Sequence, residues 1–124
     1  MRRWFLMGVG ALVLALAAPA LADGDVTRGQ KIYERCQGCH SIDRNRAGPR
    51  HRGLFGRRAG SVPGFDYSRA MRRSGIVWTA VTLDRFLAAP LKAVPGTIMG
   101  FDGVKDPRER ADLIAYLKRA TAGR

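Results

Sequence analysis

Hydrophobic positions in the first part of the chain after residue 23 recur at helical spacing. Asp25 can cap a helix that runs to about Glu34, because apolar and small residues follow it at intervals of three and four. This spacing puts Gly29 and Tyr33 on one face of the helix. A glycine on that face predicts a close approach by another element.

The strongest helix signals lie near the C-terminus. Asp106 is a suitable N-cap, Pro107 fits the first helical position, and Glu109 stands where a capping box needs a carboxylate. The stripe expected to face the core of this helix consists of Arg110, Leu113, Ile114 and Leu117.

Short helices and long loops are expected between these two ends. Residues 68–73 and 82–89 have helical patterns that stop at Gly75 and Pro90. Glycine and proline recur without periodicity in residues 41–65 and 90–105, and long loops in a small domain are usually functional. The pattern predicts one all-α domain with two such loops.

The first 22 residues have the layout of an export signal. Two arginines precede an uncharged apolar stretch, and Ala20 and Ala22 form an A-x-A cleavage site. A retained membrane anchor is the alternative, because a span needs about 20 apolar residues. Pro19 and the small residues favour cleavage, so we expect a signal peptide over 1–22, a single domain over 23–124 and a periplasmic mature protein.

The composition limits the partners. The chain has 124 residues, with 22 Lys and Arg against 10 Asp and Glu, and a net charge of +12. A hydrophobic content of 46% excludes a solvated disordered tail. The charge is compatible with nucleic acid, an anionic membrane or an acidic protein. Export argues against chromosomal DNA.

The pentapeptide Cys36-Gln37-Gly38-Cys39-His40 has three candidate chemistries. Two thiols at this spacing can join the two vinyl groups of one haem, with the adjacent imidazole on the iron. Thiol exchange usually has a strand before the motif and a helix after it, and no strand is predicted here. Zinc would need His51 as a fourth ligand, since the chain has only two cysteines. Covalent haem is favoured over both.

A haem iron bound by His40 needs a second ligand. Met71, Met99 and His51 are the side chains available after the signal segment. Met99 lies in a Pro- and Gly-rich loop that can wrap a cofactor, whereas Met71 fits a core position in a short helix. His51 stands between two arginines and is expected to be a solvated loop histidine. The pattern favours Met99.

The chain resembles class I c-type cytochromes, similar to mitochondrial cytochrome c and its periplasmic bacterial counterparts, over nearly all of residues 23–124. The matching stretches, besides the pentapeptide, are Gly48-Pro49, Gly53 to Arg57, Pro63 to Phe65, Gly75 to Trp78, Pro95 to Met99 and Arg110 to Leu117. The resemblance implies an all-α cytochrome c fold, in which the first and last helices cross and the loops wrap around one haem c. It also implies thioether links through Cys36 and Cys39 and axial ligation by His40 and Met99.

The resemblance implies further contacts of the haem. The carbonyl of Pro49 would accept a proton from the far nitrogen of His40, and Phe101 would lie beside the haem edge. The side chains expected to hold or screen the propionates are those of Arg57, Tyr67, Trp78 and Thr97.

The function implied is one-electron transfer, not enzymatic turnover. Arg35, Lys92 and Lys105 match basic positions at which acidic surfaces of membrane redox complexes would dock. The donor would be a complex such as a quinol–cytochrome c reductase, and the acceptor a terminal oxidase or a photosynthetic reaction centre. A monomer without nucleic acid or stable membrane insertion is expected. The rival classes are a haem enzyme such as a peroxidase and a basic binding module.

Three positions depart from the family pattern. His51 replaces a leucine, Phe86 replaces a tyrosine near the methionine sulfur, and Met71 replaces an asparagine. Loss of the tyrosine and asparagine removes hydrogen bonds near the ligand, which predicts an altered reduction potential. A further hypothesis is that His51 competes for the iron at high pH.

Overall fold

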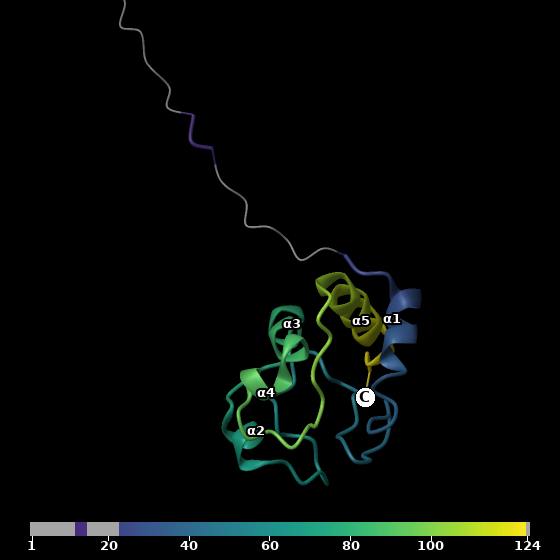
Figure 1. Cartoon of the computed structure of the whole chain (residues 1–124), viewed down its shortest axis with the longest axis vertical. Helices are drawn as coiled ribbons and strands as arrows, with labels where there is room; N and C mark the ends of the chain where they lie inside the picture. The colour runs from purple at the N-terminus through teal and green to yellow at the C-terminus, as the bar shows by residue number, and fades with distance from the viewer. Residues whose placement is uncertain (1–11, 15–22, 124) are drawn as a thin grey trace, which may run out of the picture.

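The computed structural model describes residues 12–14 and 23–123, and all of its helices lie in the second range (Figure 1). These helices are α1 (Val26–Tyr33), α2 (Arg69–Arg73), α3 (Ala80–Ala88), α4 (Pro90–Ala93) and α5 (Pro107–Ala120). Within these ranges the only β-type pairing is an isolated bridge between Arg58 and Val77. The all-α prediction is confirmed. Apart from 12–14, the predicted signal segment lies outside the described residues.

Helices able to span a bilayer are absent from residues 12–14 and 23–123. The longest helix in this part of the chain is α5, with 14 residues.

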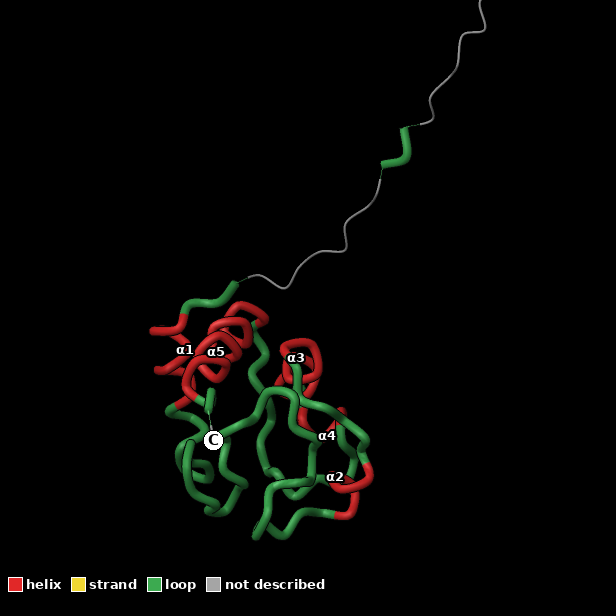
Figure 2. The backbone as a smooth tube through the Cα atoms, turned by 180° about the vertical axis from the view of Figure 1, so that it is seen from behind, coloured by secondary structure: helices red, strands yellow, loops and turns green. Residues whose placement is uncertain are grey.

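The first and last helices pack side by side, as Figures 1 and 2 show from opposite sides. Their close approach depends on Gly29, because a Cβ there would lie 1.9 Å from the carbonyl oxygen of Asp112 and 2.7 Å from Cβ of Tyr116. Tyr33 follows on the same face, with its ring centroid 5.3 Å from that of Tyr116. The predicted helix crossing is confirmed.

An ion pair at the crossing joins α5 to the start of α1. The carboxylate of Asp112 accepts a hydrogen bond from the backbone N–H of Asp25 at 2.7 Å and another from Nε of Arg28 at 3.0 Å. These two hydrogen bonds, that from Arg28 first, lower the pKa of Asp112 below its ordinary value. Asp112 thus fastens the N-terminus of α1, a role the hydrophobic pattern does not reveal.

We expect Asp112→Asn to destabilise the protein by ~1–2 kcal/mol at pH 7, because the amide keeps the shape but loses the charge opposite Arg28. A carboxyl group with a depressed pKa contributes stability above its ordinary pKa of about 3.9 and loses it as the pH falls through the folded value. The difference from the wild type should therefore shrink as the pH falls below 4. Urea unfolding at pH 7 and pH 3 measures it.

The matched control for this prediction is Asp66→Asn. The carboxylate of Asp66 forms an exposed ion pair with the guanidinium of Arg72 at 3.8 Å, and the variant removes its charge. Exposed pairs of this kind contribute little. If both variants lower the free energy of unfolding by the same amount at pH 7, the stabilising role of the ion pair between Asp112 and Arg28 is contradicted.

The start of α5 differs from the sequence prediction in one respect. Asp106 caps the helix by accepting from the backbone N–H of Arg108 at 2.8 Å, and Pro107 is the first helical residue, as predicted. Glu109 forms no capping box. Its carboxylate instead accepts from the guanidinium of Arg35 at 2.9 Å. Glu109 therefore pairs with Arg35, 74 residues earlier, and does not close the capping box.

The centre of the chain contains more helix than predicted. α3 begins at Ala80, two residues early, because Thr79 and Thr82 form a reciprocal capping box. α4 is a single turn that starts at Pro90, within the stretch predicted as loop. Proline ends α3 but has the right φ for the first position of a new helix, so one residue both stops and starts helical structure.

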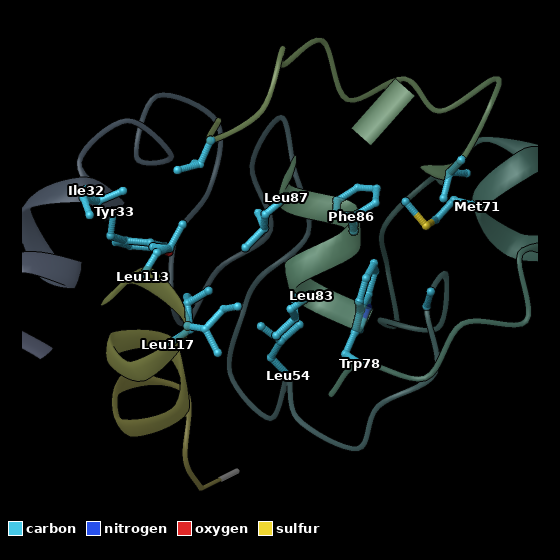
Figure 3. Close-up of a cluster of buried hydrophobic side chains, with 14 residues drawn as sticks. Ile32, Tyr33, Leu54, Met71, Trp78, Leu83, Phe86, Leu87, Leu113 and Leu117 are labelled. Carbon is cyan, nitrogen blue, oxygen red and sulfur yellow. The ribbon is translucent and has the colours of Figure 1, made fainter. Parts of the chain in front are cut away.

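The buried side chains form one cluster around these helices (Figure 3). Tyr33 and Leu113 lie at one end of this cluster and Trp78, Phe86 and Met71 at the other. The rings of Trp78 and Phe86 are 5.0 Å apart. The prediction that Met71 is a core residue is confirmed, since its exposure is 8%. Several of these side chains also border a cavity, which is where the candidate site lies.

Candidate functional site

A cavity of about 320 Å³ lies between the helices and the two long loops. The wall includes every side chain to which the sequence attributes contact with a haem: Cys36, Cys39, His40, Pro49, Arg57, Tyr67, Trp78, Thr97, Met99 and Phe101. These residues are spread over 66 positions of the sequence from Cys36 to Phe101, so the fold brings them together. The remaining wall is largely apolar and includes Leu83, Phe86 and Leu113.

The pentapeptide continues directly from α1. The backbone N–H of Cys36 bonds to the carbonyl of Tyr33 at 2.8 Å, and that of His40 to the carbonyl of Cys36 at 2.8 Å. These turns extend the helical path by roughly one and a half turns and bring both sulfurs and the imidazole to the cavity wall. The helix crossing therefore also fixes the position of the motif.

Thiol exchange does not suit this arrangement. Both cysteines are free thiols, and burial raises the pKa of Cys36 to about 11. A redox-active cysteine needs the opposite shift, because the thiolate is the reactive form. The zinc alternative fails as well. Within residues 12–14 and 23–123, no three His, Cys, Asp or Glu side chains are arranged to hold a metal ion.

The imidazole of His40 is held with one nitrogen free. Its Nδ1 lies 2.9 Å from the carbonyl oxygen of Pro49, and a carbonyl only accepts, so Nδ1 carries the proton. Within the described residues Nε2 has no hydrogen-bond partner. It is not fully buried, and His40 is part of the cavity wall. Burial lowers the pKa of His40, although the bond to Pro49 opposes this. A neutral imidazole with an unshared lone pair is what a metal ion requires.

Met99 reaches the cavity from a loop with its own internal bonds. The hydroxyl of Thr97 accepts from the backbone N–H of Met99 at 3.3 Å, and the backbone N–H of Thr97 donates to the carbonyl of Val94 at 3.0 Å. Gly96 allows the turn with φ of 92°. Met71 also borders the cavity, so both methionines predicted as candidates are within its wall.

One end of the cavity is suited to an anion. The guanidinium of Arg57 donates to the carbonyl oxygens of Arg52 at 2.8 Å and Arg50 at 3.1 Å, and in the described part of the chain no carboxylate pairs with it. Desolvation lowers the pKa of Arg57, but an arginine remains charged at neutral pH. Tyr67 and Trp78 line the same cavity. Sulfur, imidazole, apolar wall and unpaired arginine together fit a haem with its propionates.

The prediction that His51 is a solvated loop residue is wrong. Its ring stacks on that of His40, with centroids 4.2 Å apart and planes at 21°, and its Nδ1 lies 2.9 Å from the hydroxyl oxygen of Tyr33. Burial is the main cause that lowers the pKa of His51 to about 3, and repulsion from His40 when protonated and from Arg57 adds to it. The two neighbouring arginines favour a solvent-exposed side chain, but His51 instead contacts Tyr33 and His40.

The three predicted docking residues are placed differently. Arg35 borders the cavity and pairs with Glu109. Lys92 is exposed on α4, outside the cavity wall. The ammonium of Lys105 donates to the carbonyl of Ala88 at 3.1 Å. Ile98, next to Met99 in the sequence, is 67% exposed and borders the cavity. The surface around the cavity is therefore apolar as well as basic.

Comparisons with known proteins agree with this geometry. A family model described as cytochrome c matches residues 26–121. Cytochrome c of Sesamum indicum is 48% identical over 103 residues, which are 80% of this chain and 93% of that protein. Cytochrome c2 of Rhodomicrobium vannielii is 44% identical over 112 residues, covering 88% and 89%. The solved structure of cytochrome cH from Methylobacterium extorquens has a TM-score of 0.76 and 41% identity, covering 77% of this chain and 99% of that one.

Proposed function

Because the chain belongs to the cytochrome c family, we propose that it is a periplasmic one-electron carrier in which His40 and Met99 ligate the iron. Proteins of this family bind haem c covalently and transfer electrons, so the chain is an electron carrier and not an enzyme. Cys36 and Cys39 fit the attachment motif. The observation that carries the proposal is the free Nε2 of His40 in a cavity bordered by both thiols and Met99.

The bound haem would supply the one-electron chemistry, and this chain's residues set its conditions. Pro49 holds the proton on Nδ1 of His40, which keeps the lone pair of Nε2 directed into the cavity. A methionine ligand and a dry pocket both favour the reduced state of the iron. Leu83 and Phe86, 4% and 5% exposed, help to keep water out of the wall.

Further side chains have proposed supporting roles. Arg57 offers its unpaired charge to the propionates. The remaining proposed contacts of the haem are Pro49, Tyr67, Trp78, Thr97 and Phe101, which all border the cavity.

We assign residues 1–22 to a cleaved export signal and 23–124 to the working domain. Cleavage removes Arg2 and Arg3 and lowers the net charge from +12 to +10, which still favours acidic partners, because opposite charges accelerate encounter at low ionic strength. We propose that acidic surfaces of membrane redox complexes dock at Arg35, Lys92 and Lys105. The donor would be a quinol–cytochrome c reductase, and the acceptor a terminal oxidase or a photosynthetic reaction centre. The carrier would act as a monomer.

A preparation from the periplasmic fraction tests this function directly. We expect mass spectrometry to find a mature chain that begins at Asp23 and carries one covalent haem. The absorption spectrum should be that of a six-coordinate, low-spin c-type haem with sharp reduced bands. A high-spin spectrum would indicate an open iron site and an enzyme, and a chain without haem would contradict the proposal.

Partner binding is tested by the salt dependence of electron transfer. The rate constant with an acidic redox partner should fall as ionic strength rises, and Lys92→Gln should weaken this dependence. Lys118→Gln, in the last turn of α5, is the matched control. Equal salt dependence in both variants would contradict docking at Lys92.

A further inference from the structure

We propose that His51, held by Tyr33, is a positioning residue that fixes the rotation of the His40 ring about its bond to the iron. The inference rests on the proposed ligation of the iron by His40. It assigns a use to the pair formed by His51 and Tyr33.

The ring of His40 is restrained on three sides. Pro49 binds its Nδ1 at 2.9 Å. Gly48 lies so close that a Cβ there would be 2.3 Å from Cε1 of His40. The ring of His51 covers one face at a centroid distance of 4.2 Å. A hydrogen bond to Nδ1 fixes the direction of the opposite nitrogen, but rotation about that direction is limited by what packs against the faces of the ring.

His51 is itself held at both its backbone and its side chain. Its backbone N–H donates to the carbonyl of Ser41 at 3.1 Å, and its carbonyl accepts from Leu54 at 3.0 Å. Its Nδ1 shares a hydrogen bond of 2.9 Å with the hydroxyl of Tyr33. A leucine at position 51 could fill the same space, but it could neither form this bond nor stack as a flat ring.

Tyr33 connects His51 and His40 to the packing of α1 against α5. It is the last residue of α1, is 2% exposed, and packs against Tyr116 at the crossing of α1 and α5. Contacts therefore run from the helix crossing through Tyr33 and His51 to the face of His40. Each step is a side-chain contact within 6 Å between ring centroids or a hydrogen bond.

The orientation of an axial imidazole has a direct spectroscopic consequence. In a low-spin ferric haem with histidine and methionine ligands, the plane of the imidazole and the direction of the methionine sulfur lone pair together determine which iron orbital holds the unpaired electron. The spin density on the four haem methyl groups follows that orbital, so in variants that leave Met99 unchanged their proton NMR shifts report the orientation of the imidazole ring. A smaller fraction of folded or haem-loaded protein lowers the intensity of these signals and leaves their positions unchanged.

The test is proton NMR of the ferric holoprotein with His51→Leu, Tyr33→Phe and Tyr116→Phe. We expect the first two variants to change the order or spread of the four methyl shifts, because each removes part of the support of His40. Tyr116→Phe should leave the pattern unchanged, since within the described residues the hydroxyl of Tyr116 makes no hydrogen bond and its ring contact with Tyr33 is retained. Absorption spectra of all variants should remain low-spin.

The outcomes separate this inference from the proposed function. A wild-type protein without a low-spin spectrum would overturn the ligation by His40, and the inference with it. A low-spin wild type whose methyl pattern persists in His51→Leu would overturn the inference alone. If His51→Leu does not fold, Tyr33→Phe decides, because it removes one hydroxyl and preserves the packing. An unchanged pattern in that variant would then overturn the inference.

Discussion

A double Cys36→Ala, Cys39→Ala chain, freed of haem by extraction, is expected to be largely unfolded in neutral buffer. The cavity of about 320 Å³ would then contain no haem, and enclosed empty cavities cost roughly 24 cal/mol per Å³, which sets an upper limit of about 8 kcal/mol for this partly open cavity. Small domains have a total stability of about 5–15 kcal/mol, and a chain of this length lies toward the lower end. A cost approaching this limit would remove most of the stability that such a domain has. Far-UV circular dichroism and hydrogen exchange measure the remaining helix.

Gln37→Ala is the matched control, because Gln37 is exposed and lies between the two cysteines. This variant should retain its haem, its helical signal and a cooperative thermal transition. A double-cysteine variant that, after extraction, unfolds cooperatively with the helix content of the control would show that the haem is not needed to complete the core.

A Met99→Leu variant is expected to keep its covalent haem but to lose the methionine-to-iron absorption band. Leucine preserves the volume of the side chain and supplies no ligand atom. The reduction potential should fall by on the order of a few tenths of a volt, since axial ligands set haem potentials over a range of about 0.8 V and methionine raises them. Absorption spectra and redox titration of the purified protein measure both effects.

Met71→Leu is the matched control, since Met71 is the other methionine in the cavity wall. It should retain the band, and its stability should change by less than about 1.5 kcal/mol. The reverse result, with the band lost only in Met71→Leu, would move the axial ligand to α2 and contradict the proposed site.

The sequence predicts those parts of the fold that depend on near neighbours. Asp25 and Asp106 cap helices through backbone groups two or three residues away, so both starts can be read locally. Gly29 could also be recognised, because a glycine on an otherwise apolar face has few other reasons to be there. α4 could not be predicted, since its single turn depends on Pro90 both ending α3 and starting a new helix.

Features set by distant partners were missed or misread. Glu109 leaves its capping position for Arg35, 74 residues away, and Asp112 binds the start of α1 across 87 residues. His51 was predicted to be solvated because its neighbours are arginines, whereas its side chain is only partly exposed and bonds to Tyr33, 18 residues earlier. Local composition contains no record of such partners. The pentapeptide and Met99 could be singled out from the motif and its loop, whereas the other cavity residues were predicted only from the resemblance to a known family.

The packing of α1 against α5 also bears on the order in which haem attachment and helix packing take place. α1 has only eight residues, and a helix of that length is not stable in water without a partner. The partner is α5, which comes after the other described helices in the chain, so we expect α1 and the pentapeptide that follows it to settle into place only once α5 can pack against α1. On this view Cys36 and Cys39 stay accessible for haem attachment until Pro107–Ala120 packs against α1. Packing of α5 on α1 would then hold the attached group in place.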